Sequence, residues 1–353
     1  PNEIADNKKF NTITELWLKG DHYKCRAMRA LGINEKFITG SSSDEEKFMH
    51  WAACMPQLVR NPLFHWSQME LKNPFGIDDY LNESSAPVIY NQCNELLQQD
   101  AFSTRGLLKQ YNVEMVGTTD DPCDDLCHHK KISDDNFEIK VLPSFRPDKI
   151  LNIADRVSFL QYLEKLENAS GIKIKSIDNL IEALTKRIDY FHDHGCRIAD
   201  HGLTQMPTQL NLSTKLENEF INFIEDVNAA SYSEPEAFAG TILLALGKLY
   251  HANGWVQQFH LGPLRNNNSR LLNLLGADAG VDSIGDLPQA TALSKFLNAL
   301  DQNNELAKTI LYNINPADNE VFAAMCGNFN DGITKGKVQY GSGWWFLDQK
   351  DGI

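Results

Sequence analysis

The sequence predicts an α/β protein built around a parallel barrel, and two observations carry that prediction. First, six short apolar runs alternate with amphipathic helical stretches from residue 111 onward, which is typical of a parallel sheet with helical crossovers. Second, nearly every run ends in a polar turn marked by Gly or Pro. Polar residues spread over many strand ends favour a barrel, because an open doubly wound sheet concentrates its chemistry at one switch point.

The six predicted strands are short, and no G-x-G-x-x-G or P-loop pattern follows any of them, which argues against a nucleotide-binding open sheet. Six is two fewer than a (β/α)₈ barrel has. The sequence ends at residues 351–353 without a C-terminal helix signal, so we expect a longer protein that supplies one more strand at each end. The predicted strands cover residues 113–116, 137–142, 195–199, 255–260, 308–314 and 337–340.

Strand 255–260 is the most informative of the six. It is mostly apolar, reaches His260, and is followed by Arg265 and three consecutive asparagines, Asn266 to Asn268. Parallel barrels present their catalytic groups in this way, at the carboxyl ends of strands. A strand followed by a loop with one satisfied His would explain the same residues, so other strand ends must support the functional interpretation.

The first 110 residues are predicted to be helical and show no β alternation of any length. They are therefore expected to form a helical insertion or cap, 1–110, that precedes barrel repeats in 111–353. Within the cap we predict helices over 14–31, 43–57 and 85–99. Within the barrel we predict helices over 155–168, 176–192, 213–228 and 235–253.

Composition limits the classes of function. The chain has 353 residues, is 42% hydrophobic and carries a formal net charge of −14, which argues against nucleic acid or an anionic membrane as a partner. No run of 18 apolar residues and no signal-peptide pattern occurs, so a cytoplasmic location is expected. Seven scattered cysteines fit reduced thiols better than a disulfide framework. A small-molecule substrate and a homo-oligomeric state are compatible with all of this.

Two polar clusters have a structural interpretation beside a functional one. The cluster from Lys19 to Arg26 places a His, a Tyr and three cations within eight residues, but it could be a solvated helix start. The Cys123-x₃-Cys127-His128-His129 stretch suggests zinc only superficially, because no second Cys or His pair follows at the usual distance. We expect it to be a solvent-facing loop. His201, after Asp200, is expected to be structural.

Five motifs spread over the chain carry a resemblance to a known family. They are Gly20-Asp21-His22-Tyr23-Lys24 with Arg26-Ala27-Met28-Arg29, Gly117-Thr118-Thr119-Asp120-Asp121-Pro122, Phe145-Arg146-Pro147-Asp148, Gln258 to Asn268, and Gly341-Ser342-Gly343-Trp344-Trp345-Phe346. Together they resemble the uronate isomerases of the amidohydrolase superfamily, and the resemblance runs from residue 1 to residue 353. It implies a distorted, amidohydrolase-like (β/α)₈ TIM-type barrel in which the six predicted strands are strands 2 to 7 and the helical insertion follows strand 1.

The resemblance also implies a divalent metal, with zinc the expected ion. Family members bind it through a His-x-His pair on strand 1 and an Asp on strand 8, and neither is found in this sequence. No metal ligand is therefore assigned to the chain, and the ligands are expected on segments outside it.

The substrate class implied by the resemblance is a hexuronate. In its open-chain form such a sugar has an aldehyde at C1 and a carboxylate at C6. Conversion of D-glucuronate to D-fructuronate, or of D-galacturonate to D-tagaturonate, moves a proton from C2 to C1 through an enediol, a step of hexuronate catabolism. The enzyme must bind the carboxylate, stabilise the enediolate and shuttle the protons.

Residue types suited to these tasks stand in the matching motifs. Arginines meet carboxylates bidentately, so Arg146 and Arg265 are the candidates for binding C6. His260 is the candidate beside the enediolate, and Tyr23 with His22 is expected to move protons. Trp344 offers an apolar wall and an indole N–H. Thr118 is a further candidate for binding sugar hydroxyls, although threonine is common in strands for other reasons.

Two other functions remain open. One barrel hosts many chemistries, so a metal-dependent amidohydrolase-type hydrolase acting on another small polar substrate is the alternative. A hydrolase needs the metal-bound water as its nucleophile, whereas an isomerase can give that position to the substrate carbonyl. The non-enzymatic hypothesis is that the chain is a barrel fragment that only binds uronates or binds nothing.

Overall fold

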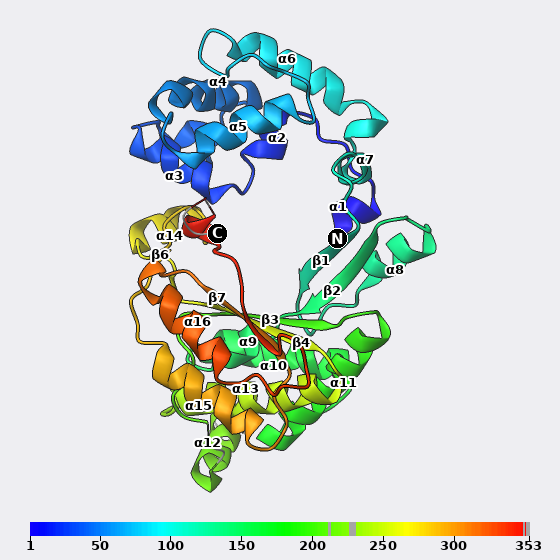
Figure 1. Ribbon diagram of the computed structural model, residues 1–353, viewed down its shortest axis with the longest axis vertical. Coiled ribbons are helices and arrows are strands. Elements are labelled where there is room, and N and C mark those ends of the chain that lie inside the picture. Colours follow the sequence, from blue (N-terminus) through cyan, green and yellow to red (C-terminus); the bar gives the residue numbers. More distant parts are fainter. Residues whose placement is uncertain (211–212, 226–230, 349, 351–353) are drawn as a thin grey trace. The chain divides into compact units, whose positions relative to one another are not determined.

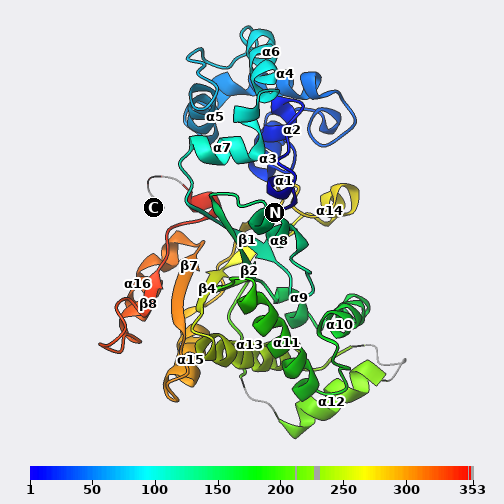
Figure 2. The same ribbon diagram turned by 90° about the vertical axis from the view of Figure 1, so that its right-hand side faces the viewer.

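A computed structural model describes residues 1–210, 213–225, 231–348 and 350 of the chain. The chain forms two compact units (Figures 1 and 2). The first unit consists of Pro1–Val116, Lys131–Lys140 and Leu264–Ser283, and the second of Gly117–Lys130, Val141–Pro263 and Ile284–Ile353. These units are defined by how compactly their residues pack, which does not test the predicted division of the chain at residue 110. That division stays a prediction. None of the helices in the described part of the chain is both long and apolar enough to cross a membrane.

The six predicted strands form one sheet and are neighbours in the order in which they occur in the sequence. Consecutive pairs from β2 onward run parallel, and the hydrogen bond from the Arg146 N–H to the Asp120 carbonyl joins β2 to β1 at the same end. Strands that are parallel and sequential with helical crossovers have the topology of a (β/α) barrel, which confirms the predicted fold class. The strands are β1 Met115–Asp120, β2 Lys140–Phe145, β3 Ile198–Leu203, β4 Val256–Leu261, β7 Lys308–Asn313 and β8 Val338–Tyr340.

Most of these strands extend further toward their carboxyl ends than predicted. Strand β3 was expected to stop at residue 199, yet Asp200 and His201 are strand residues whose partners in register are Gln258 and Phe259. A polar side chain was taken as the end of a strand, whereas hydrogen bonds between main chains continue the ladder whatever the side chain is. Two short strands were missed, because they are only two residues long: β5 Pro263–Leu264 and β6 Ser283–Ile284.

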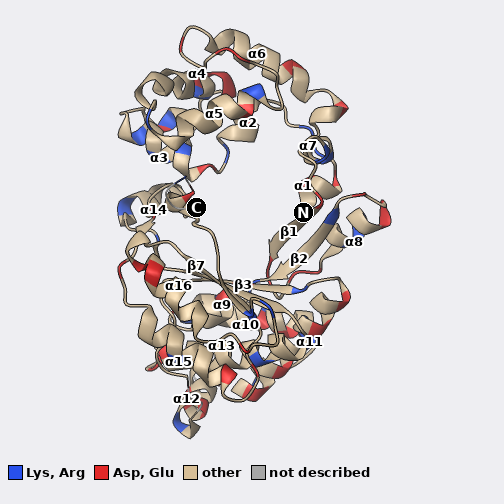
Figure 3. Ribbon diagram, viewed as in Figure 1, with Lys and Arg blue, Asp and Glu red and all other residues tan. Residues whose placement is uncertain are grey.

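Helices cover the sheet of the second unit, and α10, α11, α13 and α15 lie on one side of the strands in both views (Figures 1 and 2). Charged residues of both signs lie along α10, α11 and α12, whereas the strands above these helices in the view are mostly uncharged (Figure 3). The helices are α8 Cys127–Asp134, α9 Asp148–Leu151, α10 Arg156–Ser170, α11 Ile177–Asp193, α12 Thr214–Glu225, α13 Pro235–Ala252, α15 Ala290–Asp301, α16 Asn319–Gly327, and the 3₁₀ turns η4 Pro316–Asp318 and η5 Trp345–Leu347.

Local sequence explains where the long helices begin. The Asp155 side chain accepts from the N–H of Ser158 to cap α10, and Ser176 accepts from the N–H of Asn179 to cap α11. The apolar stripe of α11 is buried, with Phe191 edge-on to Phe145 at a centroid distance of 5.1 Å. The predictions over 155–168, 176–192 and 235–253 are therefore confirmed. Residues 226–228 of the predicted helix 213–228 lie outside the described residues.

The first unit is mostly helical, as expected for a cap. The predicted helix 14–31 is wrong as a single element, because it is interrupted at residues 18–21. Gly20 has a positive φ of 83°, and Asp21 caps a new helix by accepting from the N–H of Lys24. The helices are α1 Asn2–Ala5, α2 Ile13–Trp17, α3 His22–Ala30, α4 Asp44–Cys54, α5 Pro62–Lys72, α6 Ala86–Leu97, α7 Thr104–Gln110, α14 Ser269–Leu275, and the 3₁₀ turns η1 Glu35–Phe37, η2 Met55–Gln57 and η3 Asp100–Phe102.

Candidate active site

Arg146 is fixed at the end of β2 by two carboxylates. Its Nε lies 3.0 Å from Oδ2 of Asp148, and its Nη1 lies 3.0 Å from Oδ2 of Asp200. The guanidinium lies over Gly202 of β3, where an added Cβ would come within 2.0 Å of Nη2. Glycine at this position therefore makes room for Arg146, and the two aspartates determine its orientation.

His260 of β4 is oriented by the same aspartate. Its Nδ1 lies 2.8 Å from Oδ1 of Asp200, and the Gln258 side-chain amide donates to the same oxygen at 3.2 Å. A carboxylate only accepts, so Nδ1 carries the proton and Nε2 of the neutral ring keeps its lone pair. Nε2 of His260 has no hydrogen-bond partner within the described part of the chain. It is therefore a base that can act on a ligand.

Aromatic rings enclose His260 on two sides. The Tyr312 ring is stacked on the imidazole at a centroid distance of 4.4 Å, and the Trp344 ring stands edge-on to it at 4.9 Å. Gly341 lets the chain pass close to Tyr312, because an added Cβ would lie 2.4 Å from that ring. The Trp344 indole N–H is buried without a hydrogen-bond partner among the described residues. It can therefore donate to a ligand hydroxyl, as the sequence suggested.

Asp200 is the functional residue that the sequence analysis missed. Its side chain is buried, and burial raises the pKa of a carboxyl. The hydrogen bond and charge of His260, with the charges of Arg146 and His201, outweigh burial and lower the pKa of Asp200. The signal in the sequence was weak: Asp200 follows the predicted strand 195–199, Gln258 lies in the next predicted strand, and only the register brings them opposite each other.

His201 helps to hold Asp148, which positions Arg146, and its ring does not face solvent. The ring is fully buried; its Nδ1 lies 3.0 Å from Asp148, and its Nε2 lies 3.2 Å from the Tyr250 hydroxyl. Both nitrogens are thus engaged inside the protein. Asp148 also accepts from the Gly202 N–H at 2.8 Å, so it holds β3 and Arg146 together.

Thr118 of β1 is engaged internally, and the structure gives no support for its predicted contact with sugar hydroxyls. Its hydroxyl donates to Oδ2 of Asp120 at 2.6 Å and lies 2.7 Å from Nε2 of His129. His129 is buried on α8, so the expectation of a solvent-facing loop was wrong for this end of the Cys123–His129 stretch, whereas Cys127 is exposed. The buried side of α8 consists of His129 and Ile132, and a spacing rule for zinc does not detect a histidine on such a face.

His22 and Tyr23 open α3 in the first unit. Their rings meet edge-on at a centroid distance of 4.8 Å, and Tyr23 is also edge-on to Trp66 at 6.4 Å. Both residues line a cavity of about 570 Å³. Lys24 belongs to the same polar cluster, Lys19 to Arg26. It is buried and ion-paired with Asp21 at 2.7 Å, so it is not part of a solvated helix surface.

Arg265 is surrounded by acidic residues from the loop that follows α14. Its Nη1 lies 3.7 Å from Oδ1 of Asp278 and from Oδ2 of Asp282. We also expected the three asparagines that follow Arg265 to hold its guanidinium, but the Asn267 side chain donates to main-chain carbonyls and Asn268 caps α14.

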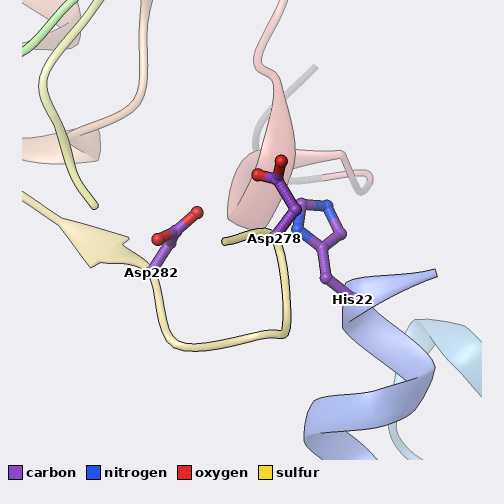
Figure 4. Close-up of side chains that lie close together, drawn as sticks. All are labelled: His22, Asp278 and Asp282. Carbon is purple, nitrogen blue, oxygen red and sulfur yellow. The ribbon is translucent and has the colours of Figure 1, made fainter. Parts of the chain in front are cut away.

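Asp278 and Asp282 also lie next to His22 (Figure 4). One ligand atom of each of these three residues lies within 4.8 Å of the others, a grouping that could attract a divalent cation. The guanidinium of Arg265 lies 3.7 Å from both carboxylates and would repel a divalent cation bound there, so the set fits a metal poorly. This grouping is the only one of its kind found among the residues that the structure describes.

The structure thus brings together Arg146, His260 and Trp344 in the second unit, through Asp200 and the aromatic rings. It brings together His22 and Arg265 in the first unit, through Asp278 and Asp282, with Tyr23 beside His22. We predict that His22, Arg146, His260, Arg265 and Trp344 lie at one rim of the barrel, and the roles of the candidate residues also stay predictions.

A family model described as glucuronate isomerase matches residues 1–353. The chain belongs to the glucuronate isomerase family. Among curated relatives, the uronate isomerase of Flavobacterium johnsoniae is 50% identical over 353 residues, which cover all of this chain and 75% of the relative. The uronate isomerase of Cellvibrio japonicus is 48% identical over 355 residues, again with all of this chain and 75% of the relative covered.

Solved structures of this family agree with the fold. The uronate isomerase of Thermotoga maritima matches with a TM-score of 0.90 and 29% identity, covering 99% of this chain and 74% of that one. The glucuronate isomerase of Caulobacter crescentus matches with a TM-score of 0.90 and 25% identity, covering 100% and 73%. The resemblance seen in the motifs is therefore confirmed. This member of the glucuronate isomerase family has the α/β barrel topology of its relatives.

Proposed function

We propose that this enzyme interconverts D-glucuronate with D-fructuronate, and D-galacturonate with D-tagaturonate, through an enediol. One observation in the structure carries the proposal: Asp200 of β3 joins a histidine of β4 that has an available nitrogen to an arginine at the end of β2, the strands on either side of β3. The match over the whole chain to the glucuronate isomerase family and to uronate isomerases supports the choice of substrate. No observation favours the alternative hydrolase.

The reaction requires a proton to leave C2 and a proton to reach C1. Removal of the C2 proton turns the C1 aldehyde into an enediolate, with negative charge on the C1 oxygen. Protonation of that oxygen gives the enediol; loss of the O2 proton and delivery of a proton to C1 give the ketose. Each step is an acid–base step, which positioned side chains accelerate by about 10²–10⁴-fold.

The side chains of the second unit suit the reacting end of the substrate. Nε2 of His260 can accept a proton because Asp200 holds the proton of the ring on Nδ1 and stabilises the imidazolium that forms. Nη2 of Arg146 can stabilise the enediolate oxygen, since Nε and Nη1 are held by Asp148 and Asp200. The Trp344 indole N–H can donate to a hydroxyl.

The first unit supplies the other predicted groups. Tyr23 is assigned to proton transfer together with His22. Arg265 is assigned to the C6 carboxylate, because its two aspartates lie 3.7 Å away, whereas Arg146 is held by two carboxylates at 3.0 Å. Asp278 and Asp282 would then hold the Arg265 guanidinium in place until a substrate carboxylate approaches.

A divalent metal is consistent with this family, and we assign zinc as the ion. When bound, it would act as a Lewis acid toward the C1 oxygen. Its ligands are expected on segments outside this chain, and the acid–base roles proposed above belong to residues of this chain. A cytoplasmic location and a homo-oligomeric state stay predictions.

The test is turnover of D-glucuronate and D-galacturonate by the full protein supplied with zinc. We expect a ketose product from each, with solvent deuterium incorporated at C1 because the transferred proton exchanges. The Tyr23→Phe variant should lose kcat by at least about 10²-fold with little change in KM, since proton transfer is a transition-state task. Absence of ketose from both hexuronates, or hydrolysis of another substrate instead, would contradict the proposal.

A further inference from the structure

Glu70 is a half-buried carboxyl on α5 that the proposed mechanism does not use. It lines the same cavity of about 570 Å³ as His22 and Tyr23, a volume within the roughly 300–1,000 Å³ range of small-molecule pockets. No hydrogen bond or ion pair to its carboxyl group occurs among the residues that the structure describes. A half-buried carboxyl without a partner in the protein has lost part of its hydration without a compensating bond, and a bound ligand can supply that bond.

The other polar groups of the cavity wall do not satisfy Glu70. The Lys24 ammonium is paired with Asp21 at 2.7 Å and lies 5.7 Å from the ring centroid of Trp17. The Tyr111 hydroxyl donates to the main-chain carbonyl of Asn73 at 2.5 Å. The Lys24 ammonium and the Tyr111 hydroxyl are therefore committed elsewhere, and Glu70 lines the cavity without a bond to either.

The surroundings of Glu70 raise the pKa of its carboxyl group. Burial raises the pKa of Glu70, the charge of Lys24 lowers it, and the charge of Asp21 raises it, with burial prevailing. A carboxyl in a pocket with a raised pKa and without a stabilising ion pair is typical of binding and catalytic sites. An acceptor of this kind pairs well with a sugar hydroxyl, which brings its own proton.

We propose that this cavity binds the hydroxylated carbon chain of the hexuronate and that Glu70 is a substrate-binding residue, accepting a hydrogen bond from one of its hydroxyls. The proposal rests on the proposed function and deepens it, because it assigns part of the substrate to the cavity beside His22 and Tyr23. In the substrate complex the carboxyl gains the partner that it lacks in the free protein.

The experiment compares three variants of the full protein. Glu70→Leu removes the carboxyl, Glu70→Gln keeps a hydrogen-bonding side chain of the same shape, and Glu95→Gln changes an exposed glutamate on α6 as the matched control. Two quantities are measured: KM for D-glucuronate, and Kd by calorimetry for L-gulonate. The latter is glucuronate reduced at C1, which cannot isomerise.

We expect Glu70→Leu to raise both constants at least tenfold, Glu70→Gln to raise them less, and Glu95→Gln to leave them unchanged. The melting temperature should not fall in Glu70→Leu, because an apolar side chain replaces a half-buried group that had no partner. This last readout separates substrate binding from a structural role, in which stability and not affinity would change.

Wild-type affinity for L-gulonate in Glu70→Leu would overturn the proposal. So would a large loss of stability in both Glu70→Leu and Glu70→Ala, since the carboxyl would then belong to the fold. Failure of the proposed function gives a different result: the wild-type protein would produce no ketose, while a Kd for L-gulonate that depends on Glu70 would still support the cavity as a binding site.

Discussion

Nδ1 of His260 lies 2.8 Å from Oδ1 of Asp200, across the neighbouring strands β4 and β3. In register, Asp200 pairs with Gln258, so His260 is two residues further along β4 and on the same face of the sheet. Through its other oxygen Asp200 holds Arg146 at 3.0 Å. One buried carboxylate therefore determines both the tautomer of His260 and the position of Arg146.

Replacing Asp200 by Asn should remove that control while keeping the shape of the side chain. The amide NH₂ group can donate to Nδ1 of His260, which would shift the imidazole proton to Nε2 and abolish the base. We expect kcat for D-glucuronate to fall by at least about 10²-fold with little change in secondary structure by circular dichroism. Asp189→Asn, at an exposed position of α11, is the control. A kcat within threefold of wild type would show that His260 does not act as the base.

The Gly202→Ala substitution should displace Arg146, although Arg146 itself is unchanged and distant in sequence. The added Cβ would lie 2.0 Å from Nη2 of Arg146, and the guanidinium cannot rotate away without leaving Asp148 or Asp200. We expect kcat/KM to fall by about tenfold, the cost of roughly one hydrogen bond to a charged group. In Gly327→Ala of α16, where no atom lies within 4 Å of the new Cβ, the steady-state constants should match wild type. Equal effects of both substitutions would argue against a role of Arg146.

Arg265→Met should lower kcat/KM for D-glucuronate by at least tenfold, because a hydrogen bond to a charged group contributes roughly 1.5–3 kcal/mol. Glucose, which lacks the C6 carboxylate, should be a very poor substrate of the wild type already, and its rate should not fall by the same factor. Steady-state kinetics with both sugars measures the difference. A proportional loss for both would move the carboxylate role to Arg146 and assign Arg265 to the enediolate or the fold.

His129 should make stability depend on pH below neutrality. Burial lowers the pKa of His129 from the ordinary value of 6.5, against the attraction of Asp120. Below pH 6.5 the unfolded chain therefore takes up a proton that the folded protein does not. The free energy of unfolding should fall as the pH falls from 6.5 toward the lower pKa of the folded state, with a slope of at most about 1.4 kcal/mol per pH unit.

Denaturant unfolding of His129→Gln between pH 5 and pH 7 measures this contribution. The Gln amide can still donate to Thr118, but it does not titrate, so the variant should show a flatter dependence on pH than wild type. Identical slopes for the two proteins would mean that His129 exchanges its proton as readily in the folded protein as in the unfolded chain.

Part of the fold could be predicted because its causes are local. The alternation of apolar runs and helical stretches depends on near neighbours, and so do the caps Asp155 and Ser176. These features gave the six strands in their order and the starts of the long helices. The break at Gly20 was also visible in the sequence, but helical periodicity over 14–31 outweighed a single glycine.

The motifs in the sequence also named most candidate site residues, because residue type limits chemistry: arginine for carboxylates, histidine and tyrosine for protons. They could not determine which partner each side chain would meet. Asp200 looked like the end of a strand until the register placed Gln258 opposite it and His260 beside it. Thr118 looked accessible until α8 brought His129 to its hydroxyl.

What the sequence determined by itself was thus the alternation of elements and the kinds of chemical group at the strand ends. Tertiary structure alone decided that Asp200 serves both His260 and Arg146, and that loop aspartates and not the neighbouring asparagines surround Arg265. The physical reason is that hydrogen bonds and ion pairs act over a few ångströms in space, while their partners here lie 13 to 60 residues apart along the chain.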